Sequence, residues 1–187
     1  MNPNALTVYR WELRKLRFQK RTYLGLGAAV AVPIIFVVAT TLRGGHPEDV
    51  AFGRYIHTTG LSIPLVLLLF GAIWMYPLIT ALVAGDIFAS EDHNGTLKTV
   101  LTRSLERQQI FAGKALAAAT YAVVAILLAA TVAVIAGCIQ SGFNSLQTLS
   151  GTLVSAPKGL ELVYVGTLVY LIPIATVVCI GLLLSAV

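Results

Sequence analysis

Few side chains in this sequence could carry covalent or metal chemistry. The histidines are His46, His57 and His93, and all three lie in polar segments between long apolar runs. No G-x-S-x-G motif accompanies them, so a Ser/His/Asp triad has no support. Cys138 and Cys179 form neither a C-x-x-C pair nor a Cys/His cluster at metal-ligand spacing. We therefore predict no catalytic residue and no metal site on this chain.

A phosphate-binding loop is also missing from the sequence. Residues 151–159 (GTLVSAPKG) contain glycines and a lysine, but not in the order G-x-x-x-x-G-K-[ST] that cradles nucleotide phosphates. We therefore expect no cofactor on this chain. If ATP drives this protein, ATP and its Mg²⁺ must bind to another chain.

The richest set of charged groups lies in residues 85–114, between two apolar runs. This stretch holds four acids and four bases. Asp92 or Asn94 can cap a short helix, because their side chains accept hydrogen bonds from the first free backbone N–H groups. Leu97 and Leu101 are four residues apart and share one face of that helix. A short helix with an exposed apolar face, held at a membrane surface, is a docking element.

The same stretch resembles the first cytoplasmic loop of ABC type-2 permeases, which reads roughly E-x-x-x-G-T-L-x-x-L-L-x-x-P-x-x-R…G-K. The matching residues are Glu91, Gly95, Thr96, Leu97, Lys98, Leu101, Arg103, Arg107, Gly113 and Lys114. The chain departs from the pattern at Ser104, where the family usually has proline. A generic capped loop at the membrane surface is the alternative interpretation.

This resemblance implies a transmembrane subunit whose loop helix, the coupling helix, contacts a separate ABC ATPase. It implies pairing with a second permease subunit, as a homodimer or a heterodimer. The residues expected to carry the coupling are Glu91, Asp92, Gly95, Thr96, Leu97, Lys98, Leu101 and Arg103. The family typically has six spans, whereas this sequence predicts four, so we expect a truncated chain or a remainder on another chain.

Bulk composition independently indicates an integral membrane protein. The chain has 187 residues, of which 57% are hydrophobic and only 11% charged, and its mean hydropathy is +0.85. Soluble domains carry about 25% charged residues. The net charge of +5 comes from bases beside apolar runs, so anionic lipid headgroups are a simpler partner than nucleic acid.

The apolar runs predict an all-α polytopic membrane helix bundle, formed as a single transmembrane domain over 1–187. The predicted parts are an amphipathic interfacial helix at 1–21, spans at 22–42, 61–90, 110–139 and 160–187, and a cytoplasmic coupling loop at 91–109. Each span is long enough to cross a hydrocarbon core of roughly 30 Å. Pro77 predicts a kink in the second span, and we expect that helix to continue to Ser90. The connector 140–158 is expected to be a loop with at most a short helix at 146–153.

The amino-terminal segment has the periodicity of a helix that lies in the membrane interface. Leu6, Tyr9, Leu13 and Leu16 share one face. Arginines follow another face, as expected for an interfacial helix. A cleaved signal peptide is the alternative, but the basic region is long and several spans follow.

The orientation follows from the lysines and arginines near the span ends. The amino-terminal segment carries six and the loop 85–114 carries four, against two in residues 43–60 and one in residues 140–158. The positive-inside rule therefore predicts a multi-pass protein of the plasma or inner membrane, with its amino terminus and docking loop in the cytoplasm.

No Asp, Glu, Lys or Arg lies deep within a predicted span, which argues against a proton- or sodium-coupled transporter. A transport pathway would be apolar, with hydroxyl and aromatic groups at a few points. The weak candidates are Trp74, Tyr76, Thr80, Thr120 and Tyr121. Each of them could instead bond its own backbone or anchor the helix at an interface.

The function that we predict is the permease subunit of an ATP-driven ABC exporter. Its substrate would be hydrophobic or amphiphilic, such as a drug, a lipid or a peptide-like molecule. The alternative is a non-transporting membrane scaffold or assembly partner that docks a cytoplasmic protein through residues 91–109.

Overall fold

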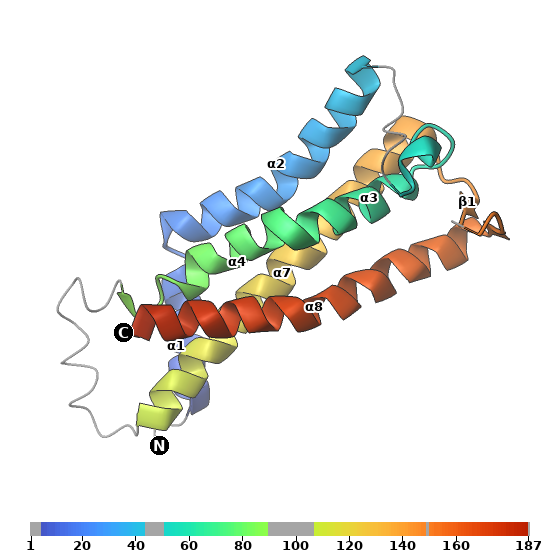
Figure 1. Cartoon of the computed structure of the whole chain (residues 1–187). Coiled ribbons are helices and arrows are strands. Elements are labelled where there is room, and N and C mark those ends of the chain that lie inside the picture. The colour runs from blue at the N-terminus through green and yellow to red at the C-terminus, as the bar shows by residue number, and fades with distance from the viewer. Residues whose placement is uncertain (1–4, 44–50, 90–106, 149, 187) are drawn as a thin grey trace. The chain divides into compact units, whose positions relative to one another are not determined.

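The computed structural model describes residues 5–43, 51–89, 107–148 and 150–186, and these residues are mostly helical (Figure 1). The helices are α1 Ala5–Leu16, α2 Lys20–Arg43, η1 Gly53–Tyr55, α3 Ser62–Phe70, η2 Gly71–Met75, α4 Tyr76–Ala84, α7 Arg107–Ser141 and α8 Ala156–Ala186. Two short strands, β1 Leu146–Gln147 and β2 Leu153–Val154, pair antiparallel.

Four stretches of the described residues are long and apolar enough to cross a membrane. They are Lys20–Leu42, Ser62–Ala84, Arg107–Ser141 and Ala156–Ser185. Lipid offers no hydrogen bonds, so a spanning segment must satisfy its backbone internally, and a helix does so. The predicted all-α membrane helix bundle is therefore confirmed. The predicted coupling loop, 91–109, lies mainly within residues 90–106, which are outside the described residues. We call residues 90–106 the coupling segment.

The second span consists of three helical pieces, α3, η2 and α4, that follow one another (Figure 1). Its middle piece, η2, is a π-helix, and the N–H of Tyr76 donates to the carbonyl of Gly71, five residues back. Pro77 has no N–H, so the α-helical hydrogen bond that it would make is missing. The sequence predicted a kink here, and the structure places a wide π turn directly before the proline.

The expected continuation of the second span to Ser90 is not observed. Helix α4 ends at Ala84, and a turn covers residues 85–88. Gly85 follows the last helical residue, as is common at helix ends. The N–H groups of Phe88 and Ala89 donate to the side-chain oxygen of Ser185 instead of continuing a helix. The turn therefore brings the chain against α8.

The connector between α7 and α8 also differs from the prediction of a loop with at most a short helix at 146–153, because two short strands pair there. Leu146 pairs with Val154, and Gln147 pairs with Leu153. Gly151 has a φ of 85°, in the left-handed region that glycine adopts readily. A helix cannot run through that residue, and the N–H of Thr148 donates to the carbonyl of Thr152 across the turn.

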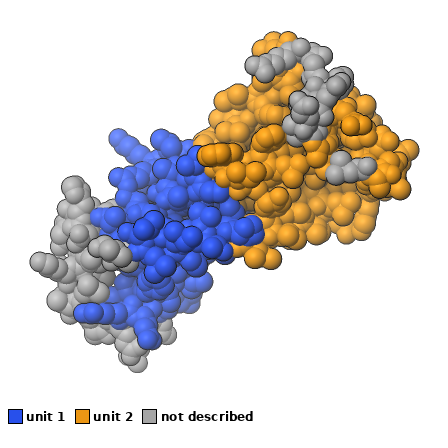
Figure 2. All heavy atoms as spheres, viewed as in Figure 1, with its two compact units in different colours: residues 1–26, 77–125, 173–187 blue, residues 27–76, 126–172 orange. Residues whose placement is uncertain are grey.

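The chain divides into two compact units (Figure 2). Unit 1 contains residues 1–26, 77–125 and 173–187, and unit 2 contains residues 27–76 and 126–172. Helices α2, α7 and α8 each contribute residues to both units. The single transmembrane domain over 1–187 stays a prediction.

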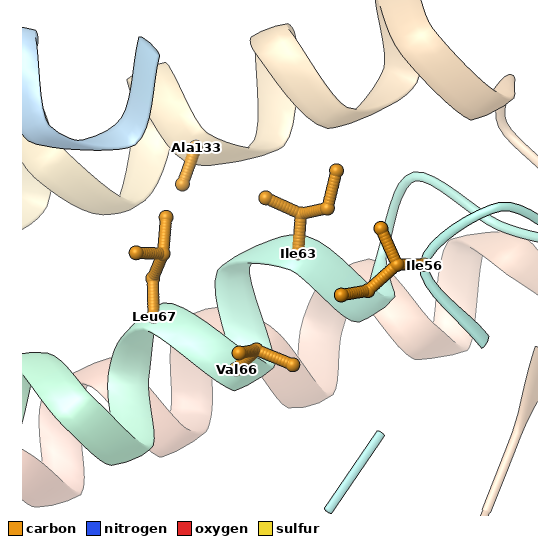
Figure 3. Packing of buried hydrophobic residues seen from close by; sticks show 5 residues of the cluster. All are labelled: Ile56, Ile63, Val66, Leu67 and Ala133. Carbon is orange, nitrogen blue, oxygen red and sulfur yellow. The ribbon is translucent and has the colours of Figure 1, made fainter. Parts of the chain in front are cut away.

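Unit 2 is built around a small aliphatic core. Ile56, Ile63, Val66, Leu67 and Ala133 are buried together, with side chains from the connector 51–61, from α3 and from α7 (Figure 3). Beside this core, the connector 51–61 meets α7 at two glycines, Gly60 and Gly137, without space for side chains. A Cβ atom at Gly60 would lie 2.3 Å from the carbonyl oxygen of Gly137. Both positions therefore require glycine.

Neutral hydrogen bonds join the connector 51–61 to the end of α7. The N–H of Gly60 donates to the carbonyl of Gly142 at 3.0 Å. The hydroxyl of Ser141 donates to the carbonyl of Ile56 at 2.6 Å, and that of Thr59 donates to the carbonyl of Asn144 at 2.9 Å. We call this set the connector network, and its members are Ile56, Thr58, Thr59, Gly60, Ser141, Gly142 and Asn144.

Candidate functional site

The candidate site lies in unit 1, at the two flanks of the predicted coupling segment. The predicted coupling residues Glu91, Asp92, Gly95, Thr96, Leu97, Lys98, Leu101 and Arg103 lie outside the described residues. The described chain stops at Ala89 before this segment and resumes at Arg107 after it. Both flanks make specific contacts, and these contacts form the site.

A buried ion pair lies at the centre of the site. The ammonium of Lys114, on α7, donates to Oε1 of Glu12, on α1, at 2.8 Å. Lys114 is 1% exposed and Glu12 is 4% exposed. Removing two charges from water is costly, and such a pair is tolerated only with good geometry and further hydrogen bonds. The sequence predicted Lys114 at a span end but assigned no role to Glu12.

The turn before the coupling segment completes the surroundings of Lys114. Its ammonium also donates to the carbonyl of Ile87 at 3.0 Å. The same ammonium lies 5.0 Å from the centroid of the Phe88 ring, at cation–π distance. Phe88 stacks on Phe111 of α7, with ring centroids 5.8 Å apart. We call Glu12, Lys114, Ile87 and Phe88 the clamp.

Two further contacts fix the same turn. The N–H groups of Phe88 and Ala89 both donate to the side-chain oxygen of Ser185, near the end of α8, at 3.0 Å. Arg21, at the start of α2, forms an ion pair with Asp86. The Arg21 side chain is largely exposed, so this pair contributes little to stability. The turn is thus held by α2, α7 and α8 together.

Helix α1 packs closely on α7 because residue 113 is glycine. A Cβ atom at Gly113 would lie 2.6 Å from Cβ of Val8 and 2.9 Å from the carbonyl oxygen of Ala5. The hydroxyls of Tyr9 and Thr120 lie 3.1 Å apart, a second polar contact between the two helices. The Gly113-Lys114 pair therefore has two physical roles, close approach and ionic attachment.

The buried face of α1 differs slightly from the predicted one. Leu16 and Glu12 are buried, whereas Leu6, expected on the same face, is 55% exposed. Glu12 lies three residues after Tyr9 and four before Leu16, on the apolar side of the helix. An acid on an apolar face was the signal that could have identified Glu12. Ser185 and Phe88 carried no comparable signal.

The five candidates for a substrate pathway divide between the two units. Trp74 and Tyr76 belong to unit 2, whereas Thr80, Thr120 and Tyr121 belong to unit 1. Trp74 is 70% exposed, and Tyr76 is buried. The hydroxyls of Thr80 and Thr120 donate to the backbone carbonyls of their own helices, at Pro77 and Leu116.

Tyr121 differs from the other four candidates. Its hydroxyl is buried and makes no hydrogen bond within the described parts of the chain. A Cβ atom at Gly25 would lie 1.9 Å from this hydroxyl, so Tyr121 reaches the backbone of α2 through a glycine. A buried hydroxyl without a partner is unfavourable by about 1–3 kcal/mol. Tyr121 is therefore the candidate with a buried hydroxyl that lacks a hydrogen-bond partner within the described residues.

The comparison with known families gives a match over nearly all of the chain. The model of the family described as ABC-2 family transporter protein matches residues 9–186. The match therefore includes Glu12, the turn at residues 85–88, Lys114 and Ser185. No curated protein matches the sequence.

Proposed function

Because the chain belongs to the ABC-2 family of transporter proteins and is a membrane permease of an ABC transporter, we propose that it exports a hydrophobic or amphiphilic substrate. Such a substrate would be a drug, a lipid or a peptide-like molecule. The chemistry of the spans supports this proposal, because the four helices offer mainly aliphatic and small side chains to a passing molecule. A strongly charged substrate would meet little compensation there.

Family membership implies an ABC ATPase as partner, and we propose that ATP and Mg²⁺ bind to that subunit. The permease would then supply no catalytic residue of its own. Two permease chains, identical or different, would pair with two ATPase subunits. The location that fits this role is the plasma or inner membrane, with the amino terminus in the cytoplasm.

The observation that carries the proposal is the fixed pair of flanks around the predicted coupling segment. Lys114 lies on the far flank, and its ammonium contacts the carbonyl of Ile87 on the near flank. Ser185 holds the near flank a second time. A segment that receives force from an ATPase needs such a base, because a loose attachment would absorb the movement.

We propose that Leu97 and Leu101 provide the main apolar contact with the ATPase. Glu91, Asp92, Lys98 and Arg103 would fix the register through charge, and Gly95 and Thr96 would shape the turn between them. Burial of one leucine contributes roughly 1.5–3 kcal/mol, so two leucines can dominate a small docking contact.

We further propose that Tyr121 contacts the polar end of the substrate, since its hydroxyl is buried without a partner within the described residues. Trp74, Tyr76, Thr80 and Thr120 remain weaker candidates. The hydroxyls of Thr80 and Thr120 already donate to backbone carbonyls.

Co-purification tests the docking proposal. The variant Leu97→Asp with Leu101→Asp should lose the ATPase, whereas Gln108→Asp, an exposed position on α7, should keep it. Both variants should insert normally, because neither changes an apolar residue of a span. Normal ATPase binding by the double variant would refute docking through this segment. Binding without any nucleotide-dependent transport would favour the scaffold alternative.

A further inference from the structure

We propose that Glu12 and Lys114 are positioning residues for coupling, because their buried ion pair makes α1 move together with both flanks of the coupling segment. This inference rests on the proposed function, since it requires an ATPase that acts on residues 90–106. It adds a role for α1, which lies far from that segment in the sequence.

A single ammonium group joins three parts of unit 1. Lys114 Nζ contacts Glu12, 102 residues earlier in the chain, and Ile87, 27 residues earlier. Ile87 lies just before the coupling segment, and Lys114 lies within the first turns of α7 after it. A displacement of either flank therefore acts on Lys114, and through Lys114 on Glu12.

Burial makes this connection stiff. Both side chains are almost completely excluded from solvent, so water cannot replace either partner if the two groups separate. Separation would leave two buried charges uncompensated, which is strongly unfavourable. The close contact of Gly113 with Val8 also prevents α1 from moving nearer to α7. The ion pair thus opposes separation of α1 from α7, and the glycine contact opposes closer approach. Helix α1 must therefore follow α7.

A second Lys–Glu pair in the same chain provides a matched comparison. Lys158 and Glu161 also lie 2.8 Å apart, but they are three residues apart on one helix and more than half exposed. This pair joins no separate elements, and water can replace either partner. Its removal should leave any coupled movement unchanged.

The test measures movement of α1 in the complete complex of permease and ATPase, reconstituted in lipid nanodiscs. A bimane fluorophore is attached at Trp11→Cys, an exposed position of α1, or at Asn94→Cys in the coupling segment. Cys138 and Cys179 are first replaced by alanine. The emission change on adding a non-hydrolysable ATP analogue with Mg²⁺ is then recorded for each probe, so no knowledge of the substrate is required.

The clamp variant for this test is Glu12→Leu with Lys114→Met, which replaces the ion pair by apolar groups of similar size. Such replacements often preserve folding. We expect the Asn94 probe to respond as in the parent and the Trp11 response to fall at least fivefold, with unchanged ATPase co-purification. The control variant Lys158→Met with Glu161→Leu should keep both responses. If the clamp variant gives too little protein, Glu12→Gln with Lys114→Gln, which removes both charges and keeps polar side chains, should lower the Trp11 response at least twofold.

Two outcomes contradict the proposal, and they differ in what they refute. A full Trp11 response in the clamp variant, or in Glu12→Gln with Lys114→Gln where that variant is needed, would make the pair a packing feature only and leave the docking proposal intact. An Asn94 probe that stays silent in the parent complex would refute the proposed function, and the role of the pair with it.

Discussion

Units 1 and 2 each attach a connecting segment to the end of a helix, but they use different interactions. In unit 1, the clamp relies on one buried ion pair, Lys114 with Glu12, and a carbonyl contact to Ile87. In unit 2, the connector network relies on neutral hydrogen bonds and on the direct backbone contact between Gly60 and Gly137. Within the described residues, no charged group takes part in the connector network.

The two chemistries respond differently to damage. A buried ion pair fails as a whole, because removal of one partner leaves the other charge without compensation. A set of neutral hydrogen bonds weakens step by step, since each bond contributes about 0.5–1.5 kcal/mol. A buried ion pair therefore suits a region that must transmit movement, as proposed for unit 1. A set of neutral hydrogen bonds suits a region that only has to keep its helices attached, as in unit 2.

The largest effect should come from breaking the clamp on one side. Lys114→Met leaves Glu12 buried without its partner, and we expect a loss of about 3–5 kcal/mol in the free energy of unfolding. Thermal unfolding of the detergent-solubilised protein measures this loss. The double variant Glu12→Leu with Lys114→Met should recover most of it. Equal stability of the single variant and the parent would show that the ion pair is not buried.

A smaller effect should follow from filling the glycine contact in unit 2. Gly60→Ala places a methyl group against the Gly137 backbone, and overpacking of this kind costs about 1–3 kcal/mol. Gly27→Ala is the control, because its Cβ atom would meet nothing within 4 Å. That substitution should be neutral or stabilising in the same unfolding assay. Destabilisation of both variants to the same extent would refute the close contact.

Removal of one hydrogen bond from the connector network should have a modest effect. Ser141→Ala deletes the donor to the carbonyl of Ile56, and we expect a loss of about 1 kcal/mol. A loss as large as that of Lys114→Met would mean that the network also fails as a whole. The contrast between the two regions would then disappear.

The exposed pair of Lys158 and Glu161 should matter least. Lys158→Ala should change the free energy of unfolding by less than about 1 kcal/mol, because solvent and salt screen exposed charges. High salt should not lower the free energy of unfolding of this variant any further. A larger loss would indicate that this pair contributes to more than local helix stability.

The sequence predicted the spans because long apolar runs in lipid have one solution for their backbone, the helix. Pro77 predicted the position of the irregular turn in the second span but not its π geometry. The clamp could not be predicted, since periodicity placed Glu12 on an apolar face but could not identify a partner 102 residues away. The hairpin was missed because it depends on the left-handed backbone at Gly151.

The sidedness of the chain decides between a coupling role for the clamp and any other role. With Cys138 and Cys179 replaced by alanine, single cysteines at Asn94 and Ser145 are treated with a membrane-impermeant thiol reagent in intact cells. Ser145 lies exposed beyond the end of α7 and should react at once, whereas Asn94 should react only after the membrane is permeabilised. Reaction of Asn94 in intact cells would place the coupling segment outside, where no ATP-driven partner could reach it.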